Sequence, residues 1–161
     1  MKRPIKDIME DDAYTCRYDQ TLGEVVQLFN ELGTSGLTVV DEERHVVGFI
    51  SDGDIMKAVS EQKTRSIFSG YSSMLLYDNE SFEDKARALR DRNVMELATT
   101  KVLCATPDQY IGTVADVLAK KRFKKVPVVD ESGVLVGVVR RATITKYIFH
   151  VLFDDEPGFD A

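Results

Sequence analysis

Long apolar runs are missing from this sequence. No stretch approaches the roughly 18 consecutive apolar residues that a transmembrane helix requires. The N-terminal residues lead into the polar pair Lys6 and Asp7, and not into the apolar core of a signal peptide. We therefore expect a cytoplasmic protein with no membrane partner.

Cysteine and histidine are also scarce, with two residues of each. Cys16 and Cys104 lie near matching places in two similar halves of the chain, where each is expected to be a small buried hydrophobic residue and not a disulfide or redox group. His45 and His150 have no second His or Cys at ligand spacing, so zinc binding is not expected. The sequence predicts no metal site.

The net charge of −6 is unevenly distributed. Residues 5–60 contain 4 basic and 12 acidic side chains, whereas residues 93–152 contain 9 basic and 5 acidic ones. The basic excess comes mainly from residues 120–125 with Arg140 and Arg141, and it can attract a phosphate-bearing ligand, although the lysines also fit a solvated helix face. No continuous basic surface or reading motif accompanies it, so we expect no nucleic-acid partner.

What the sequence does contain is a repeat of itself. Residues 19–59 align with residues 108–148 at a constant offset of 89, without a gap and with 12 identities in 41 positions. A repeat of this kind predicts two similar units that pack on each other. With 161 residues and 43% hydrophobic content, the chain is long enough for two small domains in close contact.

The hydrophobic pattern changes in the same order within each half. Apolar residues recur at helical spacing over residues 22–32 and 111–118. Short β-branched segments follow as two hairpins, at residues 37–40 with 46–50 and at 126–129 with 135–139. A second helix begins near Gly53 and near Ala142, and residues 14–16 and 102–104 supply a leading strand. The predicted order is strand, helix, strand, strand, helix in each half, which is a mixed α/β (α+β) fold.

This order and its residues resemble the CBS domain, named for cystathionine β-synthase. The resemblance rests on Val126-Pro127-Val128-Val129-Asp130, on the shorter Val39-Val40-Asp41, and on residues 48–55, which read Gly-Phe-Ile-Ser-Asp-Gly-Asp-Ile. Phrases of this kind occur twice, in the same order and at one offset. The resemblance implies a freestanding pair of CBS repeats, at residues 5–60 and 93–152, packed about a pseudo-twofold axis as a Bateman module.

The same resemblance implies a regulatory module that binds an adenosyl nucleotide, such as AMP, ADP or ATP, in the cleft between the repeats. The family's signature Gly-x-x-Ser/Thr-x-x-Asp is complete in the first repeat as Gly48, Ser51 and Asp54, beside Phe49. A carboxylate accepts hydrogen bonds from both hydroxyls of a ribose, and a hydroxyl with free amides at a helix start suits a phosphate. Ser51 or Asp52 also fits a plain helix cap.

The resemblance further implies that the partner repeat supplies the walls around the base. Backbone groups would read an adenine edge and lysines would meet phosphate at Lys101, Val102, Phe123, Lys124 and Lys125. The corresponding approach in the first repeat is residues 34–38, which include Ser35 and Gly36, and Gly36 is either a ligand neighbour or a permissive turn.

The second repeat departs from the signature. Arg140 stands in place of the hydroxyl, and Thr143 stands in place of the carboxylate. Ribose capture is not expected there, whereas the guanidinium of Arg140 or Arg141 can grip a phosphate. We therefore expect one competent nucleotide site per chain and a second that is altered or empty.

Residues 61–92 separate the repeats and are longer than a simple family linker. Residues 66–77 are rich in aromatic and aliphatic side chains without a clean period, and Ser81 begins a predicted helix. This insertion either packs against its own domain or presents a surface to a client protein. Residues 153–161 are expected to form an acidic, flexible tail.

The sequence favours binding over catalysis, because nothing in it resembles a nucleophile with its base or a metal cluster. We expect no enzyme activity and no obligatory cofactor, with an adenine nucleotide as the regulatory ligand and Mg²⁺ only in its company. The resemblance also implies a homodimer. Two alternatives stay open: a dimeric interaction scaffold with vestigial clefts, and a sensor of S-adenosylmethionine or of a cyclic dinucleotide.

Overall fold

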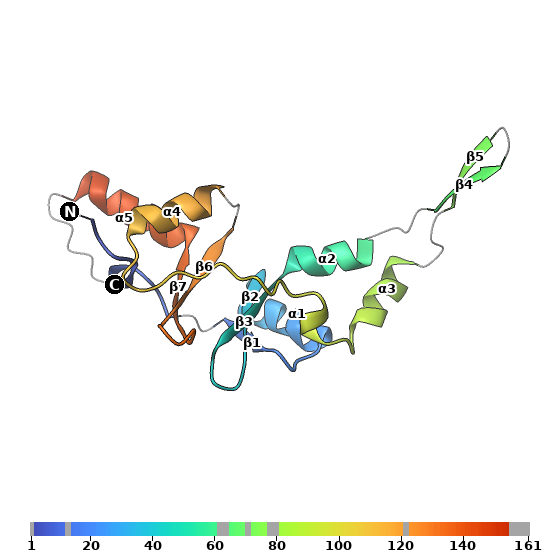
Figure 1. Ribbon diagram of the computed structural model, residues 1–161, viewed down its shortest axis with the longest axis horizontal. Helices are drawn as coiled ribbons and strands as arrows, with labels where there is room; N and C mark the ends of the chain where they lie inside the picture. Colours follow the sequence, from blue (N-terminus) through green and yellow to red (C-terminus); the bar gives the residue numbers. More distant parts are fainter. Residues whose placement is uncertain are drawn as a thin grey trace.

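The computed structural model describes residues 2–11, 14–60, 65–69, 72–76, 81–120 and 123–154. The two repeats lie end to end in an elongated molecule, and the N-terminal segment lies beside the second repeat (Figure 1). The hairpin of β4 (Arg65–Ser69) and β5 (Ser72–Leu76) projects away from the first repeat (Figure 1).

The first repeat has the predicted order of elements. It contains β1 (Thr15–Arg17), α1 (Leu22–Leu32), β2 (Gly36–Val40), β3 (Val46–Ser51) and α2 (Asp52–Ser60). Strand β1 pairs in parallel with β2, and β2 pairs antiparallel with β3. Helix α1 begins at a reciprocal capping box of Thr21 and Glu24 and ends at Gly33, whose φ of 62° suits glycine. The helices and the hairpin predicted from the hydrophobic period are confirmed here.

The second repeat has the same order with one element shortened. It contains α4 (Ile111–Lys120), β6 (Lys125–Val129), β7 (Leu135–Arg140) and α5 (Arg141–Phe153). The leading strand predicted at residues 102–104 is wrong, because a single bridge between Ala105 and Val128 stands there instead. In the first repeat the Tyr18 N–H donates to the Val40 carbonyl at 3.1 Å. The equivalent Pro107 has no N–H to donate, so the parallel pairing is not extended.

The segment before the first repeat packs on the second repeat. Glu10 and Val138 exchange two backbone hydrogen bonds, of 2.9 and 2.8 Å. The short helix η1 (Ile5–Asp7) precedes this pairing, and Ile5 and Ile8 are buried in the hydrophobic core of the second repeat. The other buried members of that core are Ala105, Ile111, Val114, Leu118, Val126, Val128, Val139 and Ile144.

The segment before the second repeat packs on the first in the equivalent way. Thr99 and Phe49 exchange two backbone hydrogen bonds of 2.9 Å, and Val94 of η2 (Val94–Glu96) is buried in the first core. The other buried members of that core are Cys16, Leu22, Val25, Leu37, Val39, Ile50, Val59 and Leu89. Because these contacts repeat at the offset of 89 residues, the two repeats are related by a pseudo-twofold axis, and each lobe contains a segment from the other half of the sequence.

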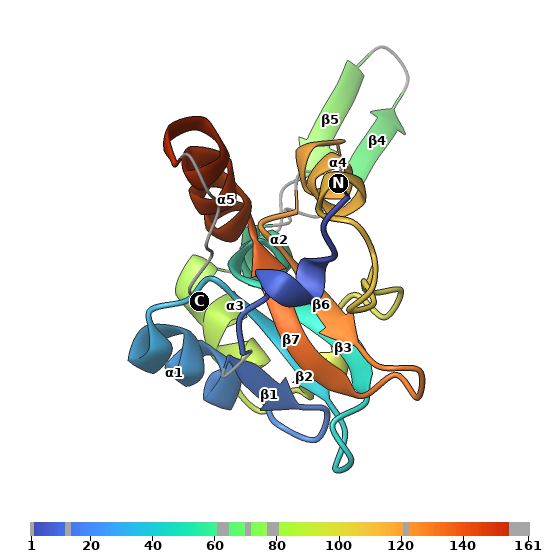
Figure 2. The same ribbon diagram turned by 90° about the vertical axis from the view of Figure 1, so that its left-hand side faces the viewer.

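The two hairpins meet at their turns. His45 and Val134 form an antiparallel bridge, supported by backbone hydrogen bonds from Val46 to Gly133 at 3.2 Å and from Leu135 to Arg44 at 2.9 Å. Figure 2 shows β6 and β7 lying across β2 and β3 in the view from the second repeat. The turns therefore fix the relative position of the two sheets near the pseudo-twofold axis.

The insertion contains one predicted element and one unforeseen element. Helix α3 (Phe82–Leu89) begins where the sequence predicts a helix, with the Ser81 hydroxyl accepting a hydrogen bond from the Asp84 N–H at 3.1 Å. Leu89 at its end is buried in the first core, so this part of the insertion packs against its own domain. The hairpin of β4 and β5 was not predicted, and residues 61–64, 70–71 and 77–80 lie outside the described residues.

The C-terminal helix includes Phe153, the first residue of the predicted tail. Helix α5 runs through Phe153, and the Asp154 N–H still donates to the His150 carbonyl at 3.0 Å. The rest of the predicted tail, residues 155–161, lies outside the described residues. Within the described ranges, no helix is long and apolar enough to cross a membrane.

Candidate functional site

A cavity of about 610 Å³ lies between the two repeats. Its volume falls within the range of about 300–1,000 Å³ that is usual for small-molecule sites. Eleven of the thirteen residues predicted as ligand-binding line it: Ser35, Gly36, Phe49, Ser51, Asp54, Lys101, Val102, Phe123, Lys124, Lys125 and Arg140. The sequence therefore identified residues that the fold brings together from both repeats.

Ser51 and Asp54 join the end of β3 to the start of α2. The Asp54 carboxylate accepts hydrogen bonds from the Ser51 N–H at 2.9 Å and from the Ser51 hydroxyl at 3.0 Å, and the Asp54 N–H donates back to the hydroxyl at 3.3 Å. All three bonds to the carboxylate and hydroxyl fit a helix cap. Both bonds to the carboxylate use Oδ2, and within the described chain Oδ1 has no hydrogen bond, so the group can cap the helix and still accept from a ligand.

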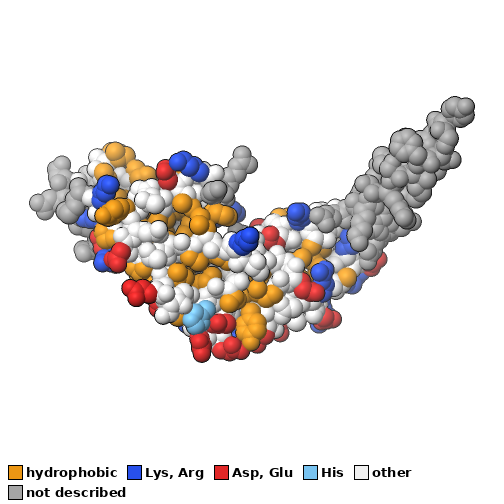
Figure 3. All heavy atoms as spheres, viewed as in Figure 1, with side chains coloured by type: hydrophobic (Ala, Val, Ile, Leu, Met, Phe, Trp, Pro, Cys, Tyr) orange, Lys and Arg blue, Asp and Glu red, His pale blue; other side chains and the backbone are white. Residues whose placement is uncertain are grey.

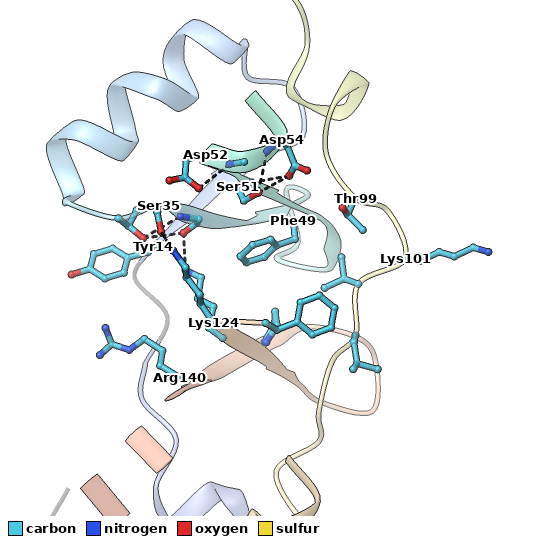
Figure 4. A pocket seen from close by; sticks show the side chains of 18 of the residues that line it. Tyr14, Ser35, Phe49, Ser51, Asp52, Asp54, Thr99, Lys101, Lys124 and Arg140 are labelled. Atoms are coloured by element: carbon cyan, nitrogen blue, oxygen red, sulfur yellow. Dashed lines mark hydrogen bonds between the residues drawn. The ribbon is translucent and has the colours of Figure 1, made fainter. Parts of the chain in front are cut away.

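Gly36 allows Phe49 to pack against the backbone of β2. A Cβ atom added at Gly36 would lie 2.9 Å from the Cζ atom of the Phe49 ring, which is closer than side chains approach each other. Gly36 does not have a positive φ. The glycine is therefore needed for space and not for a turn, and Figure 4 shows the Phe49 ring extending into the middle of the cavity.

Lys124 and Lys125 reach from the second repeat to the residues at their own equivalent positions in the first. Lys124 Nζ lies 3.4 Å from Ser35 Oγ, and Lys125 Nζ donates to the Gly36 carbonyl at 2.7 Å. The Lys125 ammonium also lies 5.6 Å from the centre of the Phe49 ring and 6.0 Å from that of the Tyr14 ring. Two cations therefore stand at the inner wall of the cavity, one of them between two aromatic rings.

Lys101 and Val102 belong to the extended segment that closes the other side of the cavity. The Lys101 side chain points away from Phe49 and Ser51 (Figure 4). Among the described residues, the backbone N–H and carbonyl groups of Lys101 and Val102 have no hydrogen-bond partner. This segment therefore offers the cavity backbone groups and the side chain of Val102, and not a lysine charge.

Arg141 and Thr143 are the two predicted residues that do not line this cavity. Arg141 Nε donates to the Phe123 carbonyl at 2.7 Å and its Nη2 donates to the Leu118 carbonyl at 2.9 Å, so the guanidinium satisfies backbone acceptors around the end of α4. Thr143 is buried, and its hydroxyl oxygen accepts from the Arg140 N–H at 3.4 Å. Thr143 thus repeats the capping role of Asp54 without its charge.

Several lining residues were not predicted. Tyr14 lies before β1, Thr99 pairs with Phe49, and Leu103 follows Val102 in the chain. Asp52 and Gly53 at the start of α2 also line the cavity, as do Gly33 and Pro127, and Thr34 lines it as part of the predicted approach at residues 34–38. Tyr14 and Leu103 occupy equivalent positions, 89 residues apart, so the repeat could have indicated that both lie at the cavity.

The cavity carries more positive than negative side chains. Apart from Lys101, whose side chain points away, three cations line it, Lys124, Lys125 and Arg140, against the two carboxylates Asp52 and Asp54. The net charge of the whole chain is −6. The positive charge is therefore concentrated locally, where it can attract an anionic ligand.

Cys16 lies in β1 and is buried and free, as the sequence predicted. Burial raises the pKa of its thiol to about 12, and the nearby charge of Lys125 opposes that rise only in part. Cys104 is free as well but only half-buried, so the prediction of a buried side chain is confirmed for Cys16 alone. Burial still raises the pKa of the Cys104 thiol. Both thiols are protonated at neutral pH, which suits packing and not nucleophilic chemistry.

Comparison with known proteins identifies the repeats. The profile of the CBS domain family matches residues 5–61 and 94–150. The uncharacterized protein MJ1426 of Methanocaldococcus jannaschii is 32% identical over 151 residues, which cover 88% of this chain and 89% of that protein. Some relatives are much longer than the match: protein MJ1225 of the same organism is 22% identical over 148 residues, which span 92% of this chain and 44% of that protein.

Solved structures have the same fold. The CBS-pair protein CBSX2 of Arabidopsis thaliana superposes with a TM-score of 0.74 at 19% identity, over 94% of this chain and 98% of that one. CBSX2 in complex with AMP gives a TM-score of 0.70 at 19% identity, over 92% of this chain and 98% of that one. The CBS domain pair of protein MJ0100, in complex with 5′-methylthioadenosine and S-adenosyl-L-methionine, gives 0.68 at 22% identity, over 94% and 99%. Since the family profile covers both repeats, the chain belongs to the CBS domain family and contains a tandem pair of its repeats.

Proposed function

We propose that this chain is a regulatory module that binds an adenine nucleotide of the AMP, ADP and ATP class in the cavity between its repeats. The observation that carries the proposal is the meeting of Ser51 and Asp54 from one repeat with Lys124 and Lys125 from the other around one cavity. The complexes of CBSX2 with AMP and of the MJ0100 pair with adenosyl ligands support an adenosyl ligand for this fold.

The ribose is assigned to Asp54. Its carboxylate lines the cavity at the first turn of α2, and its Oδ1 atom is available to accept hydrogen bonds from the two ribose hydroxyls. An aspartate is needed for this because an ionised carboxylate only accepts hydrogen bonds, and a ribose diol offers two donors. Thr143, at the equivalent place in the second repeat, has no such group.

The phosphate is assigned to Ser51, the N-terminal end of α2 and the two lysines. The N-terminal end of a helix carries a partial positive charge, which favours an anion. In α2 the N–H groups of Asp52, Gly53 and Asp54 already donate hydrogen bonds within the chain, so the attraction comes from this charge and from the Ser51 hydroxyl. Lys124 and Lys125 add full charges from the opposite wall, next to Ser35 and Gly36. Nucleotides that carry phosphate are therefore favoured over S-adenosylmethionine, whose sulfonium is itself a cation.

The base is assigned to the apolar side of the cavity. Phe49, Val102, Leu103 and Phe123 line it there, and rings and aliphatic side chains suit the two faces of a purine. The unpaired backbone groups of Lys101 and Val102 can form the polar contacts along the edge of the base. The base would lie between the Lys101 and Val102 segment and the rings of Phe49 and Phe123, which belong to different repeats. Through these contacts, ligand binding would link the two repeats.

We assign no catalytic role to the cavity and no obligatory cofactor. The Ser51 hydroxyl and the Asp54 carboxylate, which are in contact there, hold each other at the helix start. Binding would instead favour one relative orientation of the repeats, by an amount limited to the difference in ligand affinity between the two states. A client protein or a second copy of the chain would read that change. The same proposal includes a cytoplasmic location.

The second copy has a surface suited to it on α5. Ile148, Phe149, Leu152 and Phe153 share one side of this helix and are 49%, 55%, 67% and 70% exposed. Such an apolar surface indicates an interface. Residues 5–60 are strongly acidic and residues 93–152 are basic. On the face seen in Figure 3, Asp and Glu side chains gather along the lower edge of the molecule. We therefore propose a head-to-tail homodimer, in which α5 of each copy packs against the first repeat of the other.

The proposal is tested by thermal stability of ligand-stripped protein against AMP, ADP, ATP, adenosine, S-adenosylmethionine and a cyclic dinucleotide. At 100 times the dissociation constant a ligand stabilises the native state by about 2.7 kcal/mol. We expect upward shifts for the phosphorylated nucleotides. If none of these compounds raises the melting temperature, the nucleotide proposal is wrong and an interaction scaffold with vestigial clefts is the better explanation.

A further inference from the structure

Arg140 contributes both to the cavity and to an ion pair beside it. It stands at the end of β7 and lines the cavity, and its guanidinium also holds the carboxylate of Glu10. Arg140 Nε lies 2.7 Å from Glu10 Oε2, and Arg140 Nη2 lies 2.5 Å from the same oxygen. Glu10 itself is fixed in position by its two backbone hydrogen bonds to Val138.

The pseudo-twofold axis shows which residues of the first repeat correspond to this ion pair. Arg140 is equivalent to Ser51, and Glu10 is equivalent to Thr99, each at the offset of 89 residues. In the first repeat, Ser51 and Thr99 both line the cavity. At the equivalent place in the second repeat, the carboxylate of Glu10 and the guanidinium of Arg140 form an ion pair.

The polar groups of the cavity follow one another from Asp54 toward Arg140. In Figure 4, Asp54 and Thr99 lie at one end, Ser51 and Ser35 follow, and Lys124 and Arg140 lie toward the other end. With the ribose on Asp54 and the first phosphate at Ser51, further phosphates would extend past Lys124 toward Arg140. A monophosphate at Ser51 would leave Arg140 paired with Glu10, whereas a di- or triphosphate would extend toward Arg140.

We propose that Glu10 competes with the terminal phosphates of ADP or ATP for the guanidinium of Arg140. This inference rests on the proposed function and adds to it a selectivity device. The Arg140 and Glu10 side chains are 45% and 41% exposed, so water and salt weaken their attraction and an anionic phosphate can replace the carboxylate. Glu10 lowers the affinity for polyphosphates while leaving that for AMP almost unchanged.

The test is isothermal titration of AMP, ADP and ATP, at fixed Mg²⁺ and salt, into the full chain and its Glu10→Gln variant. Glutamine keeps the size of the side chain and the backbone pairing with Val138, and it removes the charge. We expect affinity for ADP and ATP to rise about two- to five-fold, as for release of an exposed ion pair, with AMP unchanged. In an Arg140→Gln background, Glu10→Gln should have no effect on any nucleotide.

Glu96→Gln is a matched control. Glu96 pairs with Arg92 at 3.0 Å, with side chains 49% and 45% exposed, and neither residue lines the cavity. Its substitution should leave all three affinities unchanged. If the parent chain binds ADP and ATP but Glu10→Gln does not strengthen that binding, or strengthens AMP equally, the competition is disproved while the proposed function stands. If the parent chain binds no nucleotide, both are wrong.

Discussion

Lys125 and Gly36 occupy equivalent positions in the two repeats and contact each other, with Lys125 Nζ donating to the Gly36 carbonyl at 2.7 Å. Lys124 and Ser35 are related in the same way. The place beside Ser51 and Asp54 therefore receives two cations from the second repeat. The equivalent place beside Arg140 and Thr143 would receive a serine and a glycine, Ser35 and Gly36, from the first repeat. This difference, together with Thr143 in place of Asp54, explains why we propose one nucleotide site per chain.

Lys125→Met is expected to weaken phosphate binding selectively. The change removes the charge and keeps most of the side-chain length beside Phe49 and Tyr14. A hydrogen bond to a charged group contributes about 1.5–3 kcal/mol, so the dissociation constant for AMP should rise about ten-fold or more, and the loss should shrink at high salt. Titration with AMP and with adenosine at two salt concentrations measures this. Adenosine should be unaffected, and Lys101→Met, whose side chain points out of the cavity, should change neither ligand.

Gly36→Ala is expected to affect binding more than stability. The new Cβ would lie 2.9 Å from Phe49 Cζ, and the ring can move only by shifting within the cavity that it lines. We expect nucleotide affinity to fall and the free energy of unfolding to fall by about 1 kcal/mol, at the lower end for overpacking. Denaturant melts and titration with AMP check this. Gly112→Ala in α4, where a Cβ meets nothing within 4 Å, should not lower either quantity.

Phe149→Lys is expected to convert the dimer to a monomer. Phe149 is 55% exposed on the apolar side of α5, so a charge there costs the isolated chain little and costs an apolar interface much. Light scattering after size exclusion gives the mass directly. A parent chain that is monomeric at all concentrations would disprove the proposed homodimer. Phe82→Lys, at an exposed apolar position of α3 outside both repeats, should leave the mass unchanged.

Cys16 is expected to make stability depend on pH above the ordinary thiol range. Its pKa is raised from 9.0 to about 12 by burial, so the folded chain keeps a proton that the unfolded chain releases. The stabilisation is complete below pH 9 and is lost as pH rises toward 12, by at most about 1.4 kcal/mol per pH unit. The unfolding free energy of the parent should therefore fall more steeply between pH 9 and 11 than that of Cys16→Ala. Parallel curves for the two proteins would contradict the assignment.

Much of the site could be predicted because its residues stand at the ends of helices and strands, and the hydrophobic pattern marks these ends in both repeats. Ser51 and Asp54 stand at a strand-to-helix junction, and Lys124 and Lys125 stand at the start of an apolar strand. The family resemblance then assigned them to one cavity. Arg141 does not line the cavity, although the sequence predicted a phosphate contact for it. The sequence does not indicate that the carbonyls of Leu118 and Phe123 accept hydrogen bonds from its guanidinium.

The exchange of segments between the lobes could not be predicted from periodicity. Ile5, Ile8 and Val94 are apolar in short segments with no helical or strand period, so the pattern does not say which core they enter. The role of Glu10 depends on that exchange, since it meets Arg140 only because its backbone pairs with Val138, 128 residues away in the sequence. Contacts of this range depend on the packing of the whole pair.

The most direct test of the central proposal is calorimetric titration of AMP into the parent chain and into Asp54→Asn. Asparagine has one amide oxygen. If that oxygen still accepts from Ser51 and caps α2, an NH2 donor faces the ribose hydroxyls in place of the carboxylate oxygen. We predict one AMP per chain for the parent and a loss of affinity of about ten-fold or more in the variant, with Asp52→Asn close to the parent. Equal affinity for the parent and Asp54→Asn, or no binding of AMP to the parent, would contradict the account.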